Sequence, residues 1–74
     1  MKRNHADMYQ QIGLNIAFYR KACGLSQIQL AELNGYSRTY ISRLETVEQI
    51  SLDSILTIAD ALEIYPAKLL ENRL

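Results

Sequence analysis

A single glycine separates two short helical patterns in the middle of the chain, in the stretch LSQIQLAELNGYSRTYISRLE of residues 25–45. Helices this short are not stable in isolation, so each must be held by packing against other parts of the chain. Leu30 and Ala31 in the first pattern, and Ile41 and Leu44 in the second, are placed to supply that contact. Ala31 is small, which lets the second helix cross the first closely. The stretch therefore predicts a helix-turn-helix, in which a tight turn joins two crossing helices.

Serine residues predict where three helices begin. Ser26 precedes Gln29 by three residues, the spacing of a capping box, and Ser37 and Ser51 stand at equivalent positions before later helical patterns. Apolar residues at helical spacing predict a longer first helix, and Pro66 suits the first turn of a last one. The chain is therefore predicted to be all-α, with five helices over residues 8–23, 27–34, 38–45, 52–63 and 66–72.

Composition is typical of one small domain. The chain has 74 residues, of which 49% are hydrophobic, and this is enough to pack a core without a disulfide or metal. Its one cysteine, Cys23, cannot form an internal bridge, and no cysteine and histidine cluster has metal-ligand spacing. We therefore expect a cytoplasmic protein with no metal, no cofactor and no membrane association. A flexible lead-in is expected over residues 1–7, followed by one domain over residues 8–74.

Charge is distributed unevenly, although the net charge is zero. Residues 1–45 hold six basic and three acidic side chains, a net charge of +3, whereas residues 46–74 hold two basic and five acidic ones, a net charge of −3. Such a molecule can present a positive face to a polyanion. The alternative is ordinary scatter of surface charge. The charge distribution alone does not distinguish a polyanion-binding face from such scatter.

The outward face of the helix over residues 38–45 carries side chains suited to DNA. Arg38 and Thr39 lie in its first turn, and Arg43 lies one to two turns further along, on what we take to be the same exposed side. Arginine can donate two hydrogen bonds to guanine, and threonine can contact a thymine methyl group, so these three residues are predicted to contact bases. Phosphate or groove-wall contacts are predicted for Ser26, Gln27, Ser37, Tyr40 and Ser42. The alternative is a solvated helix face that contains two arginines.

These segments resemble the phage repressor/Cro (XRE-type) helix-turn-helix family over residues 12–70. The similar segments are IGLNIAFYRKACGLSQ, LAELNGYSRTYISRLE and SLDSILTIADALEI, and the spacing from Arg20 through Gly24-Leu25-Ser26-Gln27 to Gly35 and Glu45 is specific. The resemblance implies a lambda-repressor-like bundle that binds double-stranded DNA through its recognition helix. It implies DNA contacts by Ser37, Arg38, Thr39 and Arg43, a phosphate contact by Gln27, and a partly buried ion pair between Arg20 and Glu45.

The sequence departs from the family pattern at two places. Family members usually have Asn-Gly after the glutamate at position 45, where this chain has Thr46-Val47. Ile28 and Leu33 are apolar at positions that are commonly polar in the family. The second departure leaves open an alternative function, a protein-interaction module of the same fold, such as an antitoxin that docks a protein partner.

Apolar residues near the C-terminus predict a homodimer, since a core of this size can hardly cover all of them. The predicted interface is Leu69, Leu70 and Leu74. The alternative is that Leu69 and Ile64 belong to the core and the other apolar residues near the C-terminus fray. The resemblance agrees, because family members commonly pair through their C-terminal helices to read palindromic operators. We expect a sequence-specific transcription regulator of the repressor/Cro-like or restriction–modification controller type. An enzyme is not expected, because the sequence has no nucleophile–base pair and no glycine-rich phosphate loop, and no small-molecule ligand is expected.

Overall fold

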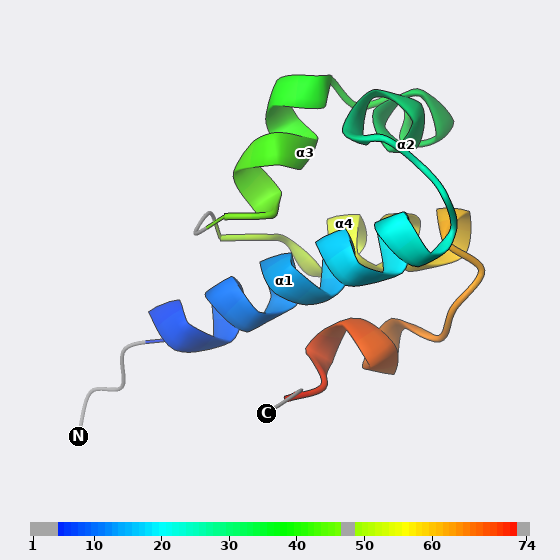
Figure 1. Cartoon of the computed structure of the whole chain (residues 1–74). Helices are drawn as coiled ribbons and strands as arrows, with labels where there is room; N and C mark the ends of the chain where they lie inside the picture. The colour runs from blue at the N-terminus through cyan, green and yellow to red at the C-terminus, as the bar shows by residue number, and fades with distance from the viewer. Residues whose placement is uncertain (1–4, 47–48, 73–74) are drawn as a thin grey trace.

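The computed structural model describes residues 5–46 and 49–72, which form four α-helices and one 3-10 helix (Figure 1). The elements are α1 (Ala6–Ala22), α2 (Gln27–Asn34), α3 (Arg38–Leu44), α4 (Leu52–Ala61) and the 3-10 helix η1 (Pro66–Leu70). The described part of the chain contains no strand, so the prediction of an all-helical fold is confirmed. In Figure 1, α2 and α3 lie on one side of the long helix α1 and η1 lies on the other.

Serine caps begin three of the helices, as the sequence predicts. Ser26 Oγ accepts a hydrogen bond from the N–H of Gln29, and the Gln29 side chain accepts one from the N–H of Ser26 at 2.8 Å. Ser37 and Ser51 cap α3 and α4 in the same manner, each through its side-chain oxygen. Helix α1 begins at Ala6, two residues before its predicted start. The lead-in predicted over residues 1–7 therefore overlaps α1, and its residues 1–4 lie outside the described residues.

The predicted count of five α-helices is not confirmed, because Pro66–Leu70 forms a 3-10 helix of five residues. The Asn15 side chain of α1 binds the C-terminal end of this 3-10 helix. Its Nδ2 donates to the carbonyl oxygens of Leu69, at 3.0 Å, and Glu71, at 2.7 Å. These bonds satisfy carbonyl groups at the end of η1 that a helix leaves without a partner of its own.

The core lies where α1, α2, α3, α4 and η1 meet. Its fully or nearly fully buried apolar residues are Ile12, Ile16, Leu30, Ala31, Ile41, Leu44, Ile50, Ile55, Ile58, Ala59, Leu62 and Leu69. Leu69 has an exposed fraction of 0% because η1 packs against both α1 and α4. This corrects the prediction of Leu69 as a dimer contact, since its side chain is already enclosed within one chain.

Gly35 sets the path of the chain from α2 into α3. Its φ of 72° is left-handed, a conformation that costs a side-chain-bearing residue about 1–2 kcal/mol. The next residue, Tyr36, donates its backbone N–H to the Ala31 carbonyl at 2.9 Å, which closes the end of α2. The chain then reaches the Ser37 cap within two residues, so α3 begins at a fixed angle to α2.

Candidate functional site

Some residues of helix α3 are buried in the core and others are exposed to solvent. Ile41 and Leu44 are buried, with exposed fractions of 0% and 2%. Arg38, Thr39 and Arg43, the three residues predicted to contact bases, are all exposed. The helix therefore exposes two cations and one hydroxyl to solvent.

From the sequence we expected Arg38 and Arg43 to lie on the same side of α3, and this expectation is wrong. Successive residues of an α-helix are about 100° apart, so Arg38 and Arg43 are separated by about 140° around the axis. Thr39 and Arg43, four residues apart, lie one above the other, and the same holds for Arg38 and Ser42. The outward face therefore has two polar edges, and Ser42, on the Arg38 edge, is half-buried.

A buried ion pair fixes the C-terminal end of α3. Arg20 Nε donates to Glu45 Oε2 at 2.7 Å and Arg20 Nη2 donates to Glu45 Oε1 at 3.1 Å. The side chains have exposed fractions of only 9% and 6%. Arg20 Nη1 also donates to the Leu25 carbonyl at 2.7 Å, so one guanidinium links α1, the start of α2 and the end of α3.

Gln27, a predicted phosphate contact, belongs to the same network. Its amide Nε2 donates to Glu45 Oε1 at 3.0 Å, and its side chain is half-buried. A glutamine amide has two hydrogens, so one remains to donate elsewhere. The neighbouring Ser26 is exposed and uses its oxygen as a helix cap, which leaves its hydroxyl hydrogen available to an acceptor.

Gly13 has a role in the site that we did not predict from the sequence. A Cβ at this position of α1 would lie 2.5 Å from the Leu44 carbonyl oxygen and 3.0 Å from the Glu45 carbonyl carbon. Both atoms belong to backbone, which cannot move aside as a flexible side chain could. The absence of a side chain at residue 13 therefore lets α1 contact the end of α3 directly. In the sequence, the only sign of this role is that a glycine stands within an otherwise helical pattern.

The Tyr40 hydroxyl contacts α4. It lies 2.8 Å from Ser54 Oγ, and Tyr36 and Ser51 donate to the same Ser54 oxygen at 3.3 and 3.1 Å. The rings of Tyr36 and Tyr40 pack edge to face, with centroids 4.8 Å apart. Ser54 itself is buried. Tyr40, predicted as a phosphate or groove-wall contact, thus also fixes the side of α3 to α4.

The remaining predicted residues are placed as follows. Ser37 Oγ accepts from the Tyr40 N–H at 3.0 Å as the cap of α3. Leu70 has an exposed fraction of 43%, and Leu74 lies outside the described residues. Thr46 Oγ1 donates to the Arg43 carbonyl at 2.8 Å, whereas Val47 lies outside the described residues.

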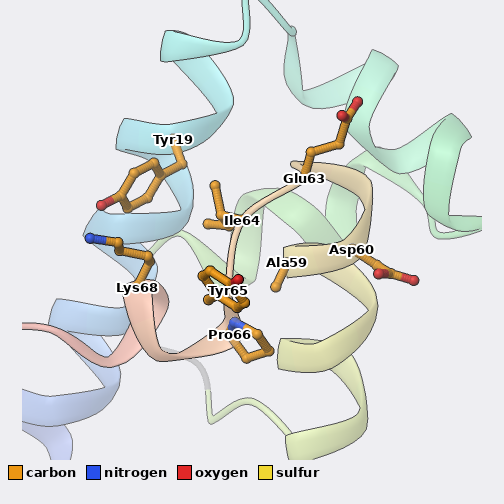
Figure 2. A pocket seen from close by; sticks show the side chains of 8 residues that line it. All are labelled: Tyr19, Ala59, Asp60, Glu63, Ile64, Tyr65, Pro66 and Lys68. Carbon is orange, nitrogen blue, oxygen red and sulfur yellow. The ribbon is translucent and has the colours of Figure 1, made fainter.

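A hollow of 640 Å³ lies between α1, α4 and η1 (Figure 2). In Figure 2, Lys68 lies beside Tyr19, across the hollow from Asp60. The lining is completed by Ala59, Glu63, Ile64, Tyr65 and Pro66. Among the described residues, no group of three or more histidine, cysteine, aspartate or glutamate side chains could hold a metal ion. No described helix is long and apolar enough to cross a membrane.

Known proteins share both the sequence pattern and the fold. Residues 16–69 match the family described as Helix-turn-helix. The control protein C.SmaI of Serratia marcescens is 38% identical over 68 residues, which cover 90% of this chain and 81% of that protein. The restriction-modification controller protein C.AhdI from Aeromonas hydrophila is 37% identical and superposes with a TM-score of 0.85, covering 90% of this chain and 99% of that chain. The hypothetical transcription factor NHTF from Neisseria is 30% identical with a TM-score of 0.86, covering 99% and 85%.

Proposed function

Because the chain belongs to the XRE-type helix-turn-helix family, we propose that it is a sequence-specific DNA-binding transcription regulator of the restriction–modification controller type. Of the similar proteins, C.AhdI is named a restriction-modification controller protein and C.SmaI a control protein. In the proposed complex α3 enters the major groove, where Arg38, Thr39 and Arg43 read base edges. Ser26 and Gln27 hold a phosphate at the start of α2, and Ser37 and Ser42 contact the backbone or the groove wall.

One observation carries this proposal. Helix α3 is held at its C-terminal end by Glu45 and on its core side by Ile41 and Leu44, while Arg38, Thr39 and Arg43 remain exposed. A helix that reads DNA needs both properties, since its angle must be fixed while its reading side chains stay accessible. A purely structural surface helix needs neither the buried ion pair nor the close approach at Gly13.

The test is a gel-shift titration with DNA from upstream of the protein's own gene. We expect that DNA to be bound at least tenfold more tightly than a scrambled duplex of equal length, with an affinity that falls as salt rises. Equal affinity for both duplexes would overturn sequence-specific recognition. No shift with either duplex at low salt would overturn DNA binding itself.

We further propose that the protein binds as a homodimer to an approximate palindrome. Leu70 is exposed at the end of η1, and Leu74 stays part of the proposed interface, whereas Leu69 does not because it is buried. Leu52 and Leu56 of α4 have exposed fractions of 67% and 47% and, four residues apart, lie on one side of that helix. A second subunit would remove these apolar side chains from water.

A second candidate function, docking of a protein partner, is favoured by one observation on α2. Ile28 and Leu33 have exposed fractions of 53% and 61%, although each is a large apolar side chain. Replacing both by serine distinguishes the candidates. A DNA-binding regulator should keep its operator affinity within about twofold, because neither residue is among the proposed DNA contacts. Loss of a co-purifying protein without any change in DNA affinity would favour the docking function.

A further inference from the structure

Asn15 of α1 is a polar residue with an exposed fraction of 0%. Its Nδ2 donates to the carbonyl oxygens of Leu69 and Glu71, at 3.0 and 2.7 Å, which uses both amide hydrogens. Its Oδ1 accepts from Gln11 Nε2 at 3.1 Å. A buried amide costs free energy unless it is bonded in this way, so packing alone would favour an apolar side chain here. Both long-range bonds go to the segment at the end of η1, so the role of Asn15 lies there.

The segment at the end of η1 depends on α1 for its position. The 3-10 helix η1 has only five residues, and helices of this kind are too short to be stable alone. Beyond it the chain is extended at Glu71, with φ of −70° and ψ of 142°. The ion pair between Lys68 and Glu71 is about half exposed and 3.7 Å long, so it adds little. The buried Leu69 side chain and the two bonds from Asn15 therefore hold this segment on α1.

Leu70 lies between the two carbonyl groups that Asn15 binds. Its side chain has an exposed fraction of 43%, whereas that of Leu69 is enclosed in the core. The bonds hold the peptide group before Leu70 and the one after Glu71, so the backbone between them has little freedom to rotate. A contact residue that is ordered before association pays less conformational entropy when a partner binds. Asn15 thus keeps an exposed apolar residue at a fixed place on the surface.

We propose that Asn15 is a positioning residue for the dimer interface, which holds the backbone on both sides of Leu70 so that this leucine meets a second subunit already ordered. The role rests on the proposed homodimer and deepens it by assigning the residue that orders its interface. Asn15 is enclosed by its own chain, so it acts only through the backbone of residues 69–71.

Gln11 supports this role by fixing the orientation of the Asn15 amide. Carbonyl oxygens only accept hydrogen bonds, so the amide must turn its Nδ2 toward Leu69 and Glu71. The bond from Gln11 Nε2 to Asn15 Oδ1 favours this orientation, because a flipped amide would place two donors against each other. Gln11 is itself half-buried and lies one turn before Asn15 on α1. Its loss should therefore weaken the positioning without removing it.

The test measures the dimer dissociation constant of purified variants by sedimentation equilibrium, without DNA. Asn15→Leu removes all three bonds but keeps a side chain of similar size, and it should raise the constant at least tenfold. Gln11→Ala leaves both bonds to the carbonyls and should raise it about threefold. Ile41→Val is the control, because it lowers stability from α3, on the other side of α1 from η1 (Figure 1). Its dissociation constant should stay within twofold of the wild-type value.

Amide hydrogen exchange of the dilute monomer gives a second readout, which a general loss of stability would not reproduce. Exchange over residues 68–72 should be several-fold faster in Asn15→Leu than in Ile41→Val, since only the first variant releases this segment. Equal exchange rates there in the two variants would contradict the role.

The remaining outcomes separate this role from the proposed function. If Asn15→Leu is folded by circular dichroism and dimerises within twofold of wild type, Asn15 does not position the interface, while the proposed homodimer stands. If Asn15→Leu does not fold, an unchanged dissociation constant of Gln11→Ala overturns the role instead. A wild-type protein that stays monomeric at tens of micromolar overturns both the role and the homodimer. DNA binding is measured separately by the gel shift, so its failure would overturn the proposed regulator without altering the dimer measurement.

Discussion

Arg38 and Arg43 lie on different edges of α3, about 140° apart around its axis, so each is expected to contact a different part of the groove. Both are exposed and neither contributes to the core. Their replacement should therefore alter DNA recognition while leaving the core intact. Gln27 differs from both, because its amide already donates to Glu45 and it lies at the start of α2.

Replacing Arg43 or Arg38 by alanine should cost roughly 1–3 kcal/mol of operator binding and relax preference at one operator position, and the two positions should differ. Gln27→Ala should instead weaken specific and non-specific DNA about equally, since a phosphate contact carries no sequence information. Binding titrations against a set of single-base operator variants measure both effects. If all three variants bound the operator like wild type, the assignment of α3 as the recognition helix would be wrong.

Gly13→Ala tests the close contact between α1 and the end of α3. Alanine is the better helix former by about 1 kcal/mol, so propensity alone would raise stability. The new Cβ would meet the Leu44 carbonyl oxygen at 2.5 Å, however, and forcing the backbones apart should cost about 1–3 kcal/mol. We expect lower stability in urea unfolding. The exposed Gln10→Ala on the same helix is the control and should change stability by less than about 0.5 kcal/mol. A stabilised Gly13→Ala variant would show that α1 can move away freely.

At the scale of elements, features that depend on neighbouring residues could be predicted from the sequence, whereas features that depend on distant residues could not. The starts of α2, α3 and α4 were predictable because the capping serine and its partner lie three residues apart. The end of η1 was not, because its carbonyl groups bind Asn15, more than fifty residues away in sequence. The Tyr40–Ser54 contact and the role of Gly13 were missed for the same reason. Patterns along the chain cannot show which side chain meets which backbone across the core.

The link between α1 and α3 can be measured by a double-mutant cycle. Arg20→Met and Glu45→Gln should each lower stability by about 3 kcal/mol, because each leaves a nearly buried charge without its partner. The double variant should be less unstable than the sum of the two losses. The exposed pair Lys68 and Glu71, 3.7 Å apart with both side chains about half exposed, is the control. Lys68→Met should cost no more than about 1 kcal/mol. Additive losses at Arg20 and Glu45 would contradict a direct interaction.

The end of α4 offers a stabilising substitution. Glu63 has a φ of 57°, the left-handed conformation that glycine usually supplies after a helix. Ile64 donates its N–H to the Ala59 carbonyl at 3.0 Å, which completes this helix end around Glu63. Glu63→Gly should therefore raise stability by about 0.5–1 kcal/mol, seen as a melting temperature higher by several degrees. Asp60→Gly, within α4, should lower it. A less stable Glu63→Gly variant would mean that the carboxylate stabilises the fold by more than its backbone conformation costs.

At the scale of the whole molecule, the faces of the chain differ in chemistry. Helix α3 lies on the same side of α1 as α2, whereas η1, which ends at the exposed Leu70, lies on the opposite side (Figure 1). This arrangement lets a second subunit bind through η1 without covering α3. Two recognition helices of such a dimer would need to be about 34–36 Å apart to enter successive major grooves.

Leu70→Glu should therefore convert a dimer into a monomer and abolish cooperative occupancy of two half-sites, because it places a charge in an apolar interface. Sedimentation velocity measures the change in mass. Leu33→Glu, at an exposed apolar residue of α2 with an exposed fraction of 61%, is the control and should remain dimeric. Leu69→Glu is unsuitable because that residue lies in the core. A wild-type protein that sediments as a monomer at tens of micromolar would contradict this interface.

The division of α3 between buried and exposed residues has a consequence for how such regulators diversify. Arg38 and Thr39 are exposed, while Ile41, Leu44 and Glu45 fix the helix in place. If Arg38 and Thr39 contact bases as proposed, the fold and the DNA target depend on different codons. Substitutions at positions 38 and 39 would then change the target while the three residues that hold the helix stay the same. Two regulators in one cell could thus become insulated from each other's promoters by very few mutations.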